Sequence, residues 1–188
     1  MDNQQKSEVD SVPKQIRRIV TGVNAAGRSA IIIDGPAPDV IPFAGSPLAF
    51  STLLWTTDRA PASNGGNADM APAGRMVPVA PAHSGGTVFR IVEFAPDKTY
   101  DISKVNMAAH GAEVTADRTA KHYRFHRTNT VDYGIVLEGE IWAIFDEGEA
   151  LLNPGDVVIQ RGTYHSWANR SDQVCRMAFI LIDADPPS

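Results

Sequence analysis

The sequence GDVVIQRGTYHSWAN at residues 155–169 decides the fold, because it contains two short strand patterns separated by a tight turn. The residues at 153–156, Asn-Pro-Gly-Asp, form turns readily, and the β-branched run at residues 157–160 follows them. After the turn at Gly162, a second strand pattern begins at His165. The stretch therefore predicts two successive β-strands.

The same succession of strands and turns extends through residues 121–183. The breaks between the strand-like runs are rich in Gly, Asn, Asp and Pro, which favour turns. Almost no helix fits into this half, so the predicted fold class is all-β, a sandwich or barrel. The runs recur roughly every eight to twelve residues, at residues 122–128, 132–137, 141–145, 150–152, 157–160, 165–169 and 174–183.

The N-terminal part supplies further strands and loops. Residues 1–12 are polar and predict a disordered tail, which leaves residues 13–188 as a single domain. Within residues 13–120, two β-branched runs around a turn predict a hairpin over residues 15–33. The Pro-rich segment at 36–47 is expected to be neither helix nor central strand, and strands are expected at 50–57 and 87–95. Residues 60–86 predict a long surface loop, and residues 100–116 predict a helical stretch.

Composition limits the classes of function. The chain has 188 residues, 43% of them apolar, and a net charge of −5, so it suits a globular domain and gives no reason to expect a nucleic-acid partner. The basic stretch at residues 118–127 is interpreted as a solvated strand face. No apolar run reaches about eighteen residues and no secretory signal is present, which predicts a cytoplasmic protein without a membrane partner. The single cysteine, Cys175, is expected to be a small buried hydrophobic residue.

Two motifs within residues 121–183 resemble those of the cupin superfamily. In that family the first motif is His-x-His followed by Glu and then Gly, and the second contains Gly-x-x-His-x-x-x-Asn after an earlier Gly. The resemblance implies a cupin jelly-roll β-barrel, here with extra N-terminal strands. The positions that match are His126, Gly139, Gly155, Gly162, His165 and Asn169.

The chain departs from the family pattern at four points. Thr128 stands where the family has its second His, and Asp132 stands in place of the Glu. The second motif is one residue shorter before His165 and lacks its Pro. Because metal-dependent cupins use these positions as ligands, the resemblance implies His126, Asp132 and His165 as ligands of a divalent Fe, Mn, Ni or Zn ion. Two imidazoles and a carboxylate suit non-haem iron in particular.

Other side chains are candidates for the site. His126 and His165 are also the predicted catalytic residues, and His122 is expected near the barrel rim, since it lies four residues before His126. His83 and His110 are expected at the surface. Candidates for substrate contact, with core packing as the alternative for the aromatic ones, are Arg90, Tyr133, Trp142, Arg161, Tyr164 and Trp167.

Two functions follow from this interpretation. The first is a metal-dependent enzyme acting on a small organic acid or an oxygenated aromatic, as a dioxygenase, decarboxylase, isomerase or lyase. The second is a metal-free cupin that works by His acid–base chemistry, or a module that binds or senses a small ligand. The family resemblance also implies a homodimer, in which the hairpin at residues 15–33 augments a sheet or a partner subunit.

Overall fold

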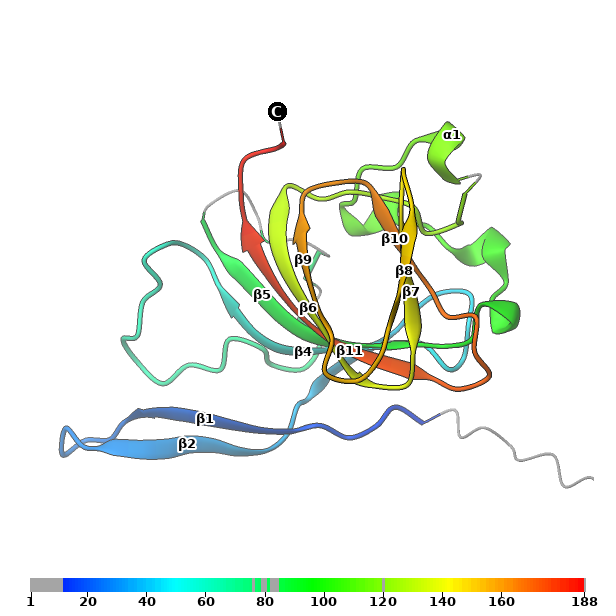
Figure 1. Ribbon diagram of the computed structural model, residues 1–188. Helices are drawn as coiled ribbons and strands as arrows, with labels where there is room; N and C mark the ends of the chain where they lie inside the picture. Colours follow the sequence, from blue (N-terminus) through cyan, green and yellow to red (C-terminus); the bar gives the residue numbers. More distant parts are fainter. Residues whose placement is uncertain (1–11, 76, 79–80, 82–84, 120, 188) are drawn as a thin grey trace, which may run out of the picture.

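The computed structural model describes residues 12–75, 77, 78, 81, 85–119 and 121–187. Strands dominate this part of the chain, and they form three antiparallel sheets (Figure 1). The all-β prediction is therefore confirmed. The predicted tail at residues 1–12, apart from Val12, and the predicted surface position of His83 lie outside the described residues.

A six-stranded sheet and a three-stranded sheet face each other and enclose the core (Figure 1). The large sheet has the order β3 (Asp39–Pro42), β4 (Phe50–Thr57), β5 (Thr87–Phe94), β11 (Cys175–Asp183), β6 (Thr130–Glu138) and β9 (Val157–Arg161). The small sheet has the order β10 (His165–Ala168), β7 (Ile141–Phe145) and β8 (Glu149–Leu152). Within the Pro-rich segment, residues 39–42 form β3, which lies at the edge of the large sheet. An edge position suits this segment because proline has no backbone N–H to donate to a second neighbouring strand.

Alternation along the central strands decides which side chains enter the barrel. On β5, Val88, Arg90 and Val92 lie on one face and are buried. On β11, Cys175 is fully buried in the same core, which confirms its predicted role as a small hydrophobic residue. The buried members of the main cluster are Leu53, Ala71, Val88, Val92, Phe94, Val136, Ile141, Ala143, Leu152, Trp167, Cys175, Met177, Phe179 and Leu181.

The predicted N-terminal hairpin is confirmed as β1 (Arg17–Val23) and β2 (Ser29–Pro36), which form a two-stranded sheet of their own. In the described part of the chain, neither strand pairs with a barrel sheet, so the hairpin does not augment its own barrel. Arg18 ties it to the barrel by donating to Asp69 Oδ2 at 2.6 Å and to the Leu54 carbonyl at 3.0 Å. The hairpin extends beyond the barrel as an arm (Figure 1).

Two sequence predictions about local structure are wrong. The expected strand at residues 122–128 is mostly a turn, because the Phe125 N–H bonds the His122 carbonyl at 2.9 Å; only His126 and Arg127 form isolated bridges. The expected helical stretch at 100–116 consists of short 3-10 turns, with Gly111 at a φ of 84° ending one of them. The short helical elements are η1 (Asp97–Thr99), η2 (Ile102–Lys104), η3 (Ala108–His110) and α1 (Ala116–Thr119), and no described helix is long and apolar enough to cross a membrane.

Gly139, which closes the first motif, is required by its surroundings. Its φ is 73°, and a Cβ atom there would lie 2.8 Å from the Val174 carbonyl oxygen. We expect Gly139→Ala to lower the free energy of unfolding by roughly 3 kcal/mol, the cost of a left-handed residue plus overpacking. Gly148→Ala is the matched control, since Gly148 has a φ of 85° with open space around it, and should lose only about 1 kcal/mol. Urea unfolding measures both, and equal losses would contradict the steric argument.

Candidate active site in the barrel

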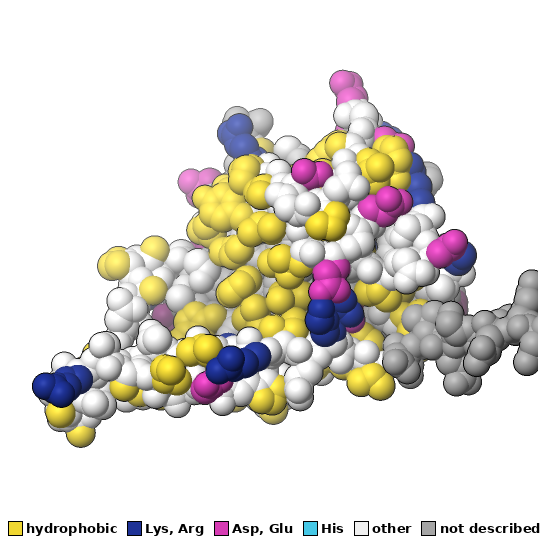
Figure 2. All heavy atoms as spheres, turned by 60° about the horizontal axis from the view of Figure 1, so that its bottom comes forward, with side chains coloured by type: hydrophobic (Ala, Val, Ile, Leu, Met, Phe, Trp, Pro, Cys, Tyr) yellow, Lys and Arg dark blue, Asp and Glu magenta, His cyan; other side chains and the backbone are white. Residues whose placement is uncertain are grey.

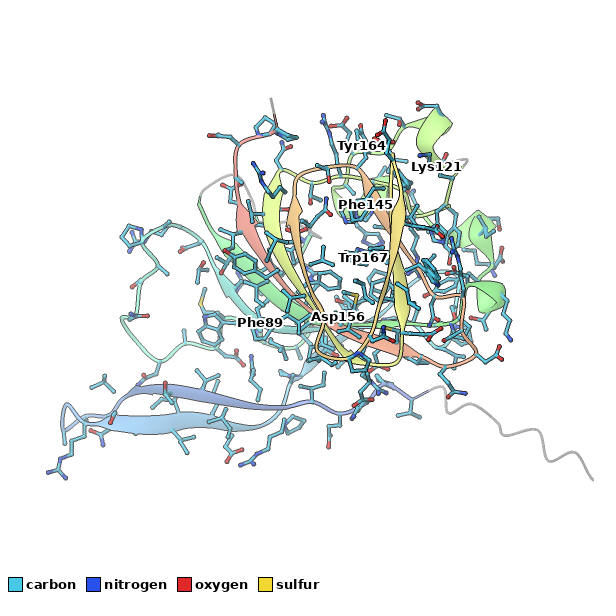
Figure 3. The ribbon with its side chains drawn as sticks, viewed as in Figure 1. Phe89, Lys121, Phe145, Asp156, Tyr164 and Trp167 are labelled. Carbon is cyan, nitrogen blue, oxygen red and sulfur yellow. The ribbon has the colours of Figure 1, made fainter. Side chains whose placement is uncertain are left out.

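A pocket opens between the two sheets and combines an apolar wall with a few buried polar groups. Trp167 lies between the sheets in Figure 3 and belongs to this wall. The described residues that line the pocket are Phe43, Ala44, Arg90, Val92, Phe94, Val105, Asn106, Met107, His110, Arg124, His126, Thr128, Asp132, His165, Trp167, Phe179 and Leu181. The pocket therefore collects His126, His165 and Asp132, the three predicted metal ligands, on its surface.

The two histidines are held as a pair by their backbones. The N–H of each residue bonds the carbonyl of the other at 2.9 Å, and the ring centroids are 4.6 Å apart. His126 Nδ1 lies 2.6 Å from the Arg124 carbonyl oxygen, and His165 Nδ1 lies 3.0 Å from the Thr163 carbonyl oxygen. Since a carbonyl only accepts, each Nδ1 must carry the proton. Each neutral ring then keeps its lone pair on Nε2.

Burial keeps both imidazoles neutral. Loss of hydration lowers the pKa of His126 to about 4. Burial, followed by the charge that a protonated His126 would carry, lowers the pKa of His165 to about 3. At neutral pH both rings are therefore uncharged bases.

Asp132 is a buried carboxyl group with an incomplete set of partners. It lies on the inward face of β6, and its Oδ1 has no hydrogen-bond partner among the described residues. Burial raises the pKa of Asp132 to about 6, against a smaller lowering by the Thr130 hydroxyl. Asp132 therefore holds a proton at a higher pH than an ordinary aspartate.

The residues present do not make a three-ligand metal site. Among the described residues, no three His, Cys, Asp or Glu side chains come close enough together to hold an ion. Two changes from the family pattern explain this. Thr128 offers a hydroxyl that is already paired with the Thr130 hydroxyl at 2.7 Å, and Asp132 is one methylene shorter than a Glu. The predicted set of His126, Asp132 and His165 thus shares a pocket without forming a metal-binding group.

The predicted substrate-contact residues divide between the inside and the outside of the barrel. Arg90 and Trp167 line the pocket. Tyr133 is 40% exposed on the outer face, since it follows the inward Asp132 on the same strand, and Arg161 is exposed at the end of β9. Tyr133, Trp142, Arg161 and Tyr164 are absent from the described pocket lining, and Trp142 instead packs beneath the Arg170 guanidinium at 4.8 Å.

Two pocket residues were missed in the sequence. His110 was expected at the surface but lines the pocket, with its ring 6.3 Å from the Phe43 ring centroid. Arg124 was interpreted as part of a solvated strand face, yet it is buried in the pocket wall. Strand periodicity could not locate Arg124, because the segment before His126 is a turn.

His122 belongs to a separate network behind the pocket. Its Nδ1 lies 2.5 Å from Ser166 Oγ, and its Nε2 lies 3.3 Å from Asp97 Oδ2. Ser166 is fully buried, on the face of β10 opposite His165 and Trp167. The network fixes the start of β10, and the expected position of His122 on the same face as His126 is wrong because the strand is interrupted.

Comparison with known proteins places the chain in a family. A family model described as "Cupin domain" matches residues 112–182. The chain is 33% identical over 175 residues to "Phomopsin biosynthesis cluster protein C'" of Diaporthe leptostromiformis, covering 90% of this chain and 79% of the relative. It is 32% identical over 184 residues to "Cupin-domain-containing oxidoreductase srdD" of Neurospora crassa, covering 93% and 81% respectively. The chain belongs to the family of cupin-domain proteins, some of which are named oxidoreductases.

The unpaired Asp132 carboxyl predicts a pH-dependent effect on stability. Its pKa is raised on folding, so its ionised form destabilises the folded state above pH 6 and has no such effect below pH 4. We expect Asp132→Asn to increase the free energy of unfolding by on the order of 2 kcal/mol at pH 8 and to give no such gain at pH 4. Asp172→Asn, which removes an exposed carboxyl with a lowered pKa, should give no gain at pH 8. Chemical unfolding at the two pH values tests this, and a gain that does not depend on pH would contradict it.

Proposed function

We propose that this cupin-domain protein is an enzyme that transfers protons on a small organic molecule bound in the barrel pocket. The observation that carries the proposal is the pair of buried imidazoles whose Nδ1 atoms are fixed by backbone carbonyls, which leaves two Nε2 lone pairs at the pocket wall. The relatives named oxidoreductases support an enzymatic role. His126 and His165 act as general bases, and Asp132 acts as a general acid.

The proton transfer follows from this arrangement. An Nε2 atom removes a proton from a carbon next to a carbonyl group, and the C–H electron pair moves toward the carbonyl to form an enol. The carboxyl group of Asp132, the pKa of which lies near 6, supplies a proton to the developing oxygen. Return of a proton from solvent or from the imidazolium to the same carbon, while the enol O–H gives its proton back to the Asp132 carboxylate, restores the carbonyl and completes an exchange or an inversion at that carbon. Each neutral ring has an Nε2 lone pair that can accept the proton, whereas a protonated imidazole could not.

The metal-dependent enzyme predicted from the sequence receives less support from the donor set. His126 and His165 are the ligands that such an ion would use, but the third donor is displaced or replaced, as described for Asp132 and Thr128. The two functions differ in a simple measurement. Metal-free chemistry survives a chelator, whereas chemistry through a divalent ion is lost with the ion.

Deuterium exchange in the benzylic methylene of phenylpyruvate tests the proposed function, since that carbon lies next to a carbonyl in a small aromatic acid. We expect the protein to accelerate exchange in D2O, and His126→Gln or His165→Gln to reduce the acceleration at least tenfold, within the usual contribution of a general base. Arg28→Gln, at the exposed hairpin turn, is the surface control. The rate should be unchanged by EDTA. Exchange no faster than in buffer, or loss of rate with EDTA, would reject the metal-free mechanism.

We propose that a second copy of the chain covers the outer face of the large sheet. Four apolar side chains of β6 and β9 are between 40% and 56% exposed there, namely Tyr133, Leu137, Val157 and Ile159. Figure 2 shows hydrophobic side chains gathered on the barrel beside the hairpin. The hairpin carries exposed Ile19, Val23 and Ile31 and reaches past its own barrel, so the arm of one copy is suited to cover the sheet face of the other.

Charge on this face should therefore prevent assembly. We expect the protein to be a dimer by size-exclusion chromatography with light scattering, and Ile159→Glu to convert it to a monomer, because an unpaired carboxylate would be buried in the interface. Ile102→Glu, at an equally exposed position on η2, is the matched control and should remain a dimer. A monomeric wild-type protein would contradict this arrangement.

A further inference from the structure

Arg124 places a guanidinium in the pocket wall inside a cage of aromatic rings. Its Cζ lies 4.1 Å from the Tyr100 ring centroid, and 5.5 to 5.9 Å from the centroids of Phe94, Tyr123 and Phe43. The side chain is buried and lines the same pocket as the histidine pair. Aromatic faces stabilise a cation and hold the planar group in position, but they accept no strong hydrogen bonds from its five N–H donors.

No described carboxylate forms an ion pair with Arg124. The carboxylate of the adjoining network, Asp97, is engaged by the Tyr123 hydroxyl at 2.9 Å and by His122 Nε2 at 3.3 Å. Burial raises the pKa of Tyr100, and the charge of Arg124 and a hydrogen bond with it oppose this rise; the Tyr100 hydroxyl is nevertheless a neutral group that does not balance the charge of the guanidinium. A buried arginine is ordinarily paired, so Arg124 has donors in excess of its protein partners.

The charged side chains of the pocket lining as a whole also carry more positive than negative charge. Arg90, the second buried guanidinium of the lining, donates to the Pro78 carbonyl at 2.6 Å, and its Nε has no partner among the described residues. Burial lowers the pKa of Arg90 to about 10, and the charge of Asp39 opposes this lowering. Asp39 lies outside the pocket lining and forms no ion pair with Arg90 among the described residues. Among the described lining residues Asp132 is the one acidic side chain, so two fixed cations face one carboxyl group.

We infer that the pocket binds a small organic carboxylate, with the carboxylate held by Arg124 and the apolar body of the ligand against Trp167, Phe94 and Phe179. The planar fork of a guanidinium matches the two oxygens of a carboxylate, and an anion would satisfy donors that the protein leaves open. The apolar wall then covers the rest of the molecule. This inference rests on the proposed function for the location of the site, and it names the class of substrate on which the histidine pair acts.

Binding of benzoate and benzamide, measured by isothermal titration calorimetry at pH 7.5, tests the inference. The two probes share a ring and a planar head group and differ in charge. We expect the wild-type protein to bind benzoate at least tenfold more tightly than benzamide. Arg124→Gln should lower the affinity for benzoate to that for benzamide while leaving benzamide binding within about twofold. Equal affinities in the wild type, a benzoate preference that survives in Arg124→Gln, or no benzoate binding at millimolar concentration would overturn the inference.

Two further variants separate binding from folding. Arg124→Lys keeps the charge in the cage but loses the fork, so part of the benzoate preference should remain if Arg124→Gln has removed all of it. Arg28→Gln, an exposed charge change far from the lining, should keep the full preference. Thermal unfolding identifies any variant that is not folded, and loss of the preference in a folded Arg124→Gln supports the inference.

The binding test also separates this inference from the proposed chemistry. His126→Gln should reduce the accelerated exchange of phenylpyruvate at least tenfold and still bind benzoate with the wild-type preference, because the carboxylate contacts Arg124 rather than the imidazole. Benzoate preference without any exchange activity would leave the anion site standing and reject the proton-transfer function. Exchange activity without a benzoate preference would reject the anion site alone.

Discussion

The reciprocal pair of backbone hydrogen bonds between His126 and His165 is the constraint on which the site depends. His126 lies in an irregular segment that follows a turn, while His165 begins a strand of the small sheet. Together with the hydrogen bond between His122 and Ser166, this pairing fixes the position of the segment before β6 relative to β10. The pairing sets the ring centroids 4.6 Å apart and brings Arg124, two residues before His126, into the wall of the same pocket.

Burial gives that pair its chemistry. The large sheet and the small sheet exclude water from the rings, and the cost of placing a charge there keeps both imidazoles neutral. The same cost makes Asp132 a weaker acid. A low-dielectric pocket thus contains uncharged bases, a carboxyl group that retains its proton near pH 6, and guanidinium groups that remain charged throughout. This distribution suits a negatively charged ligand and a reaction in which protons move.

The chain changes residues inside the cupin barrel and also adds elements outside it. Thr128 and Asp132 occupy the positions at which the family motif has its second His and its Glu, and in the structure the Thr128 hydroxyl pairs with the Thr130 hydroxyl. The outer surface has its own addition, since the β1–β2 arm and the apolar face of β6 and β9 lie outside the barrel core. The departures inside the barrel lie at the candidate site, whereas the additions on the outer surface lie where we propose that a second copy binds.

The sequence by itself determined most of the strands and the motif positions of the two histidines. The strand expected at residues 87–95 is found as β5, and the turn residues correctly separated β9 from β10, because these signals depend on neighbours in the chain. Only the tertiary structure decided the rest of the pocket. Arg124 and His110 reach it through turns with no period, and Tyr133 and Arg161 were lost from it because a residue adjacent to an inward side chain on a strand faces outward. Contacts between segments distant in the chain, such as His122 with Ser166, leave no local pattern from which they could be predicted.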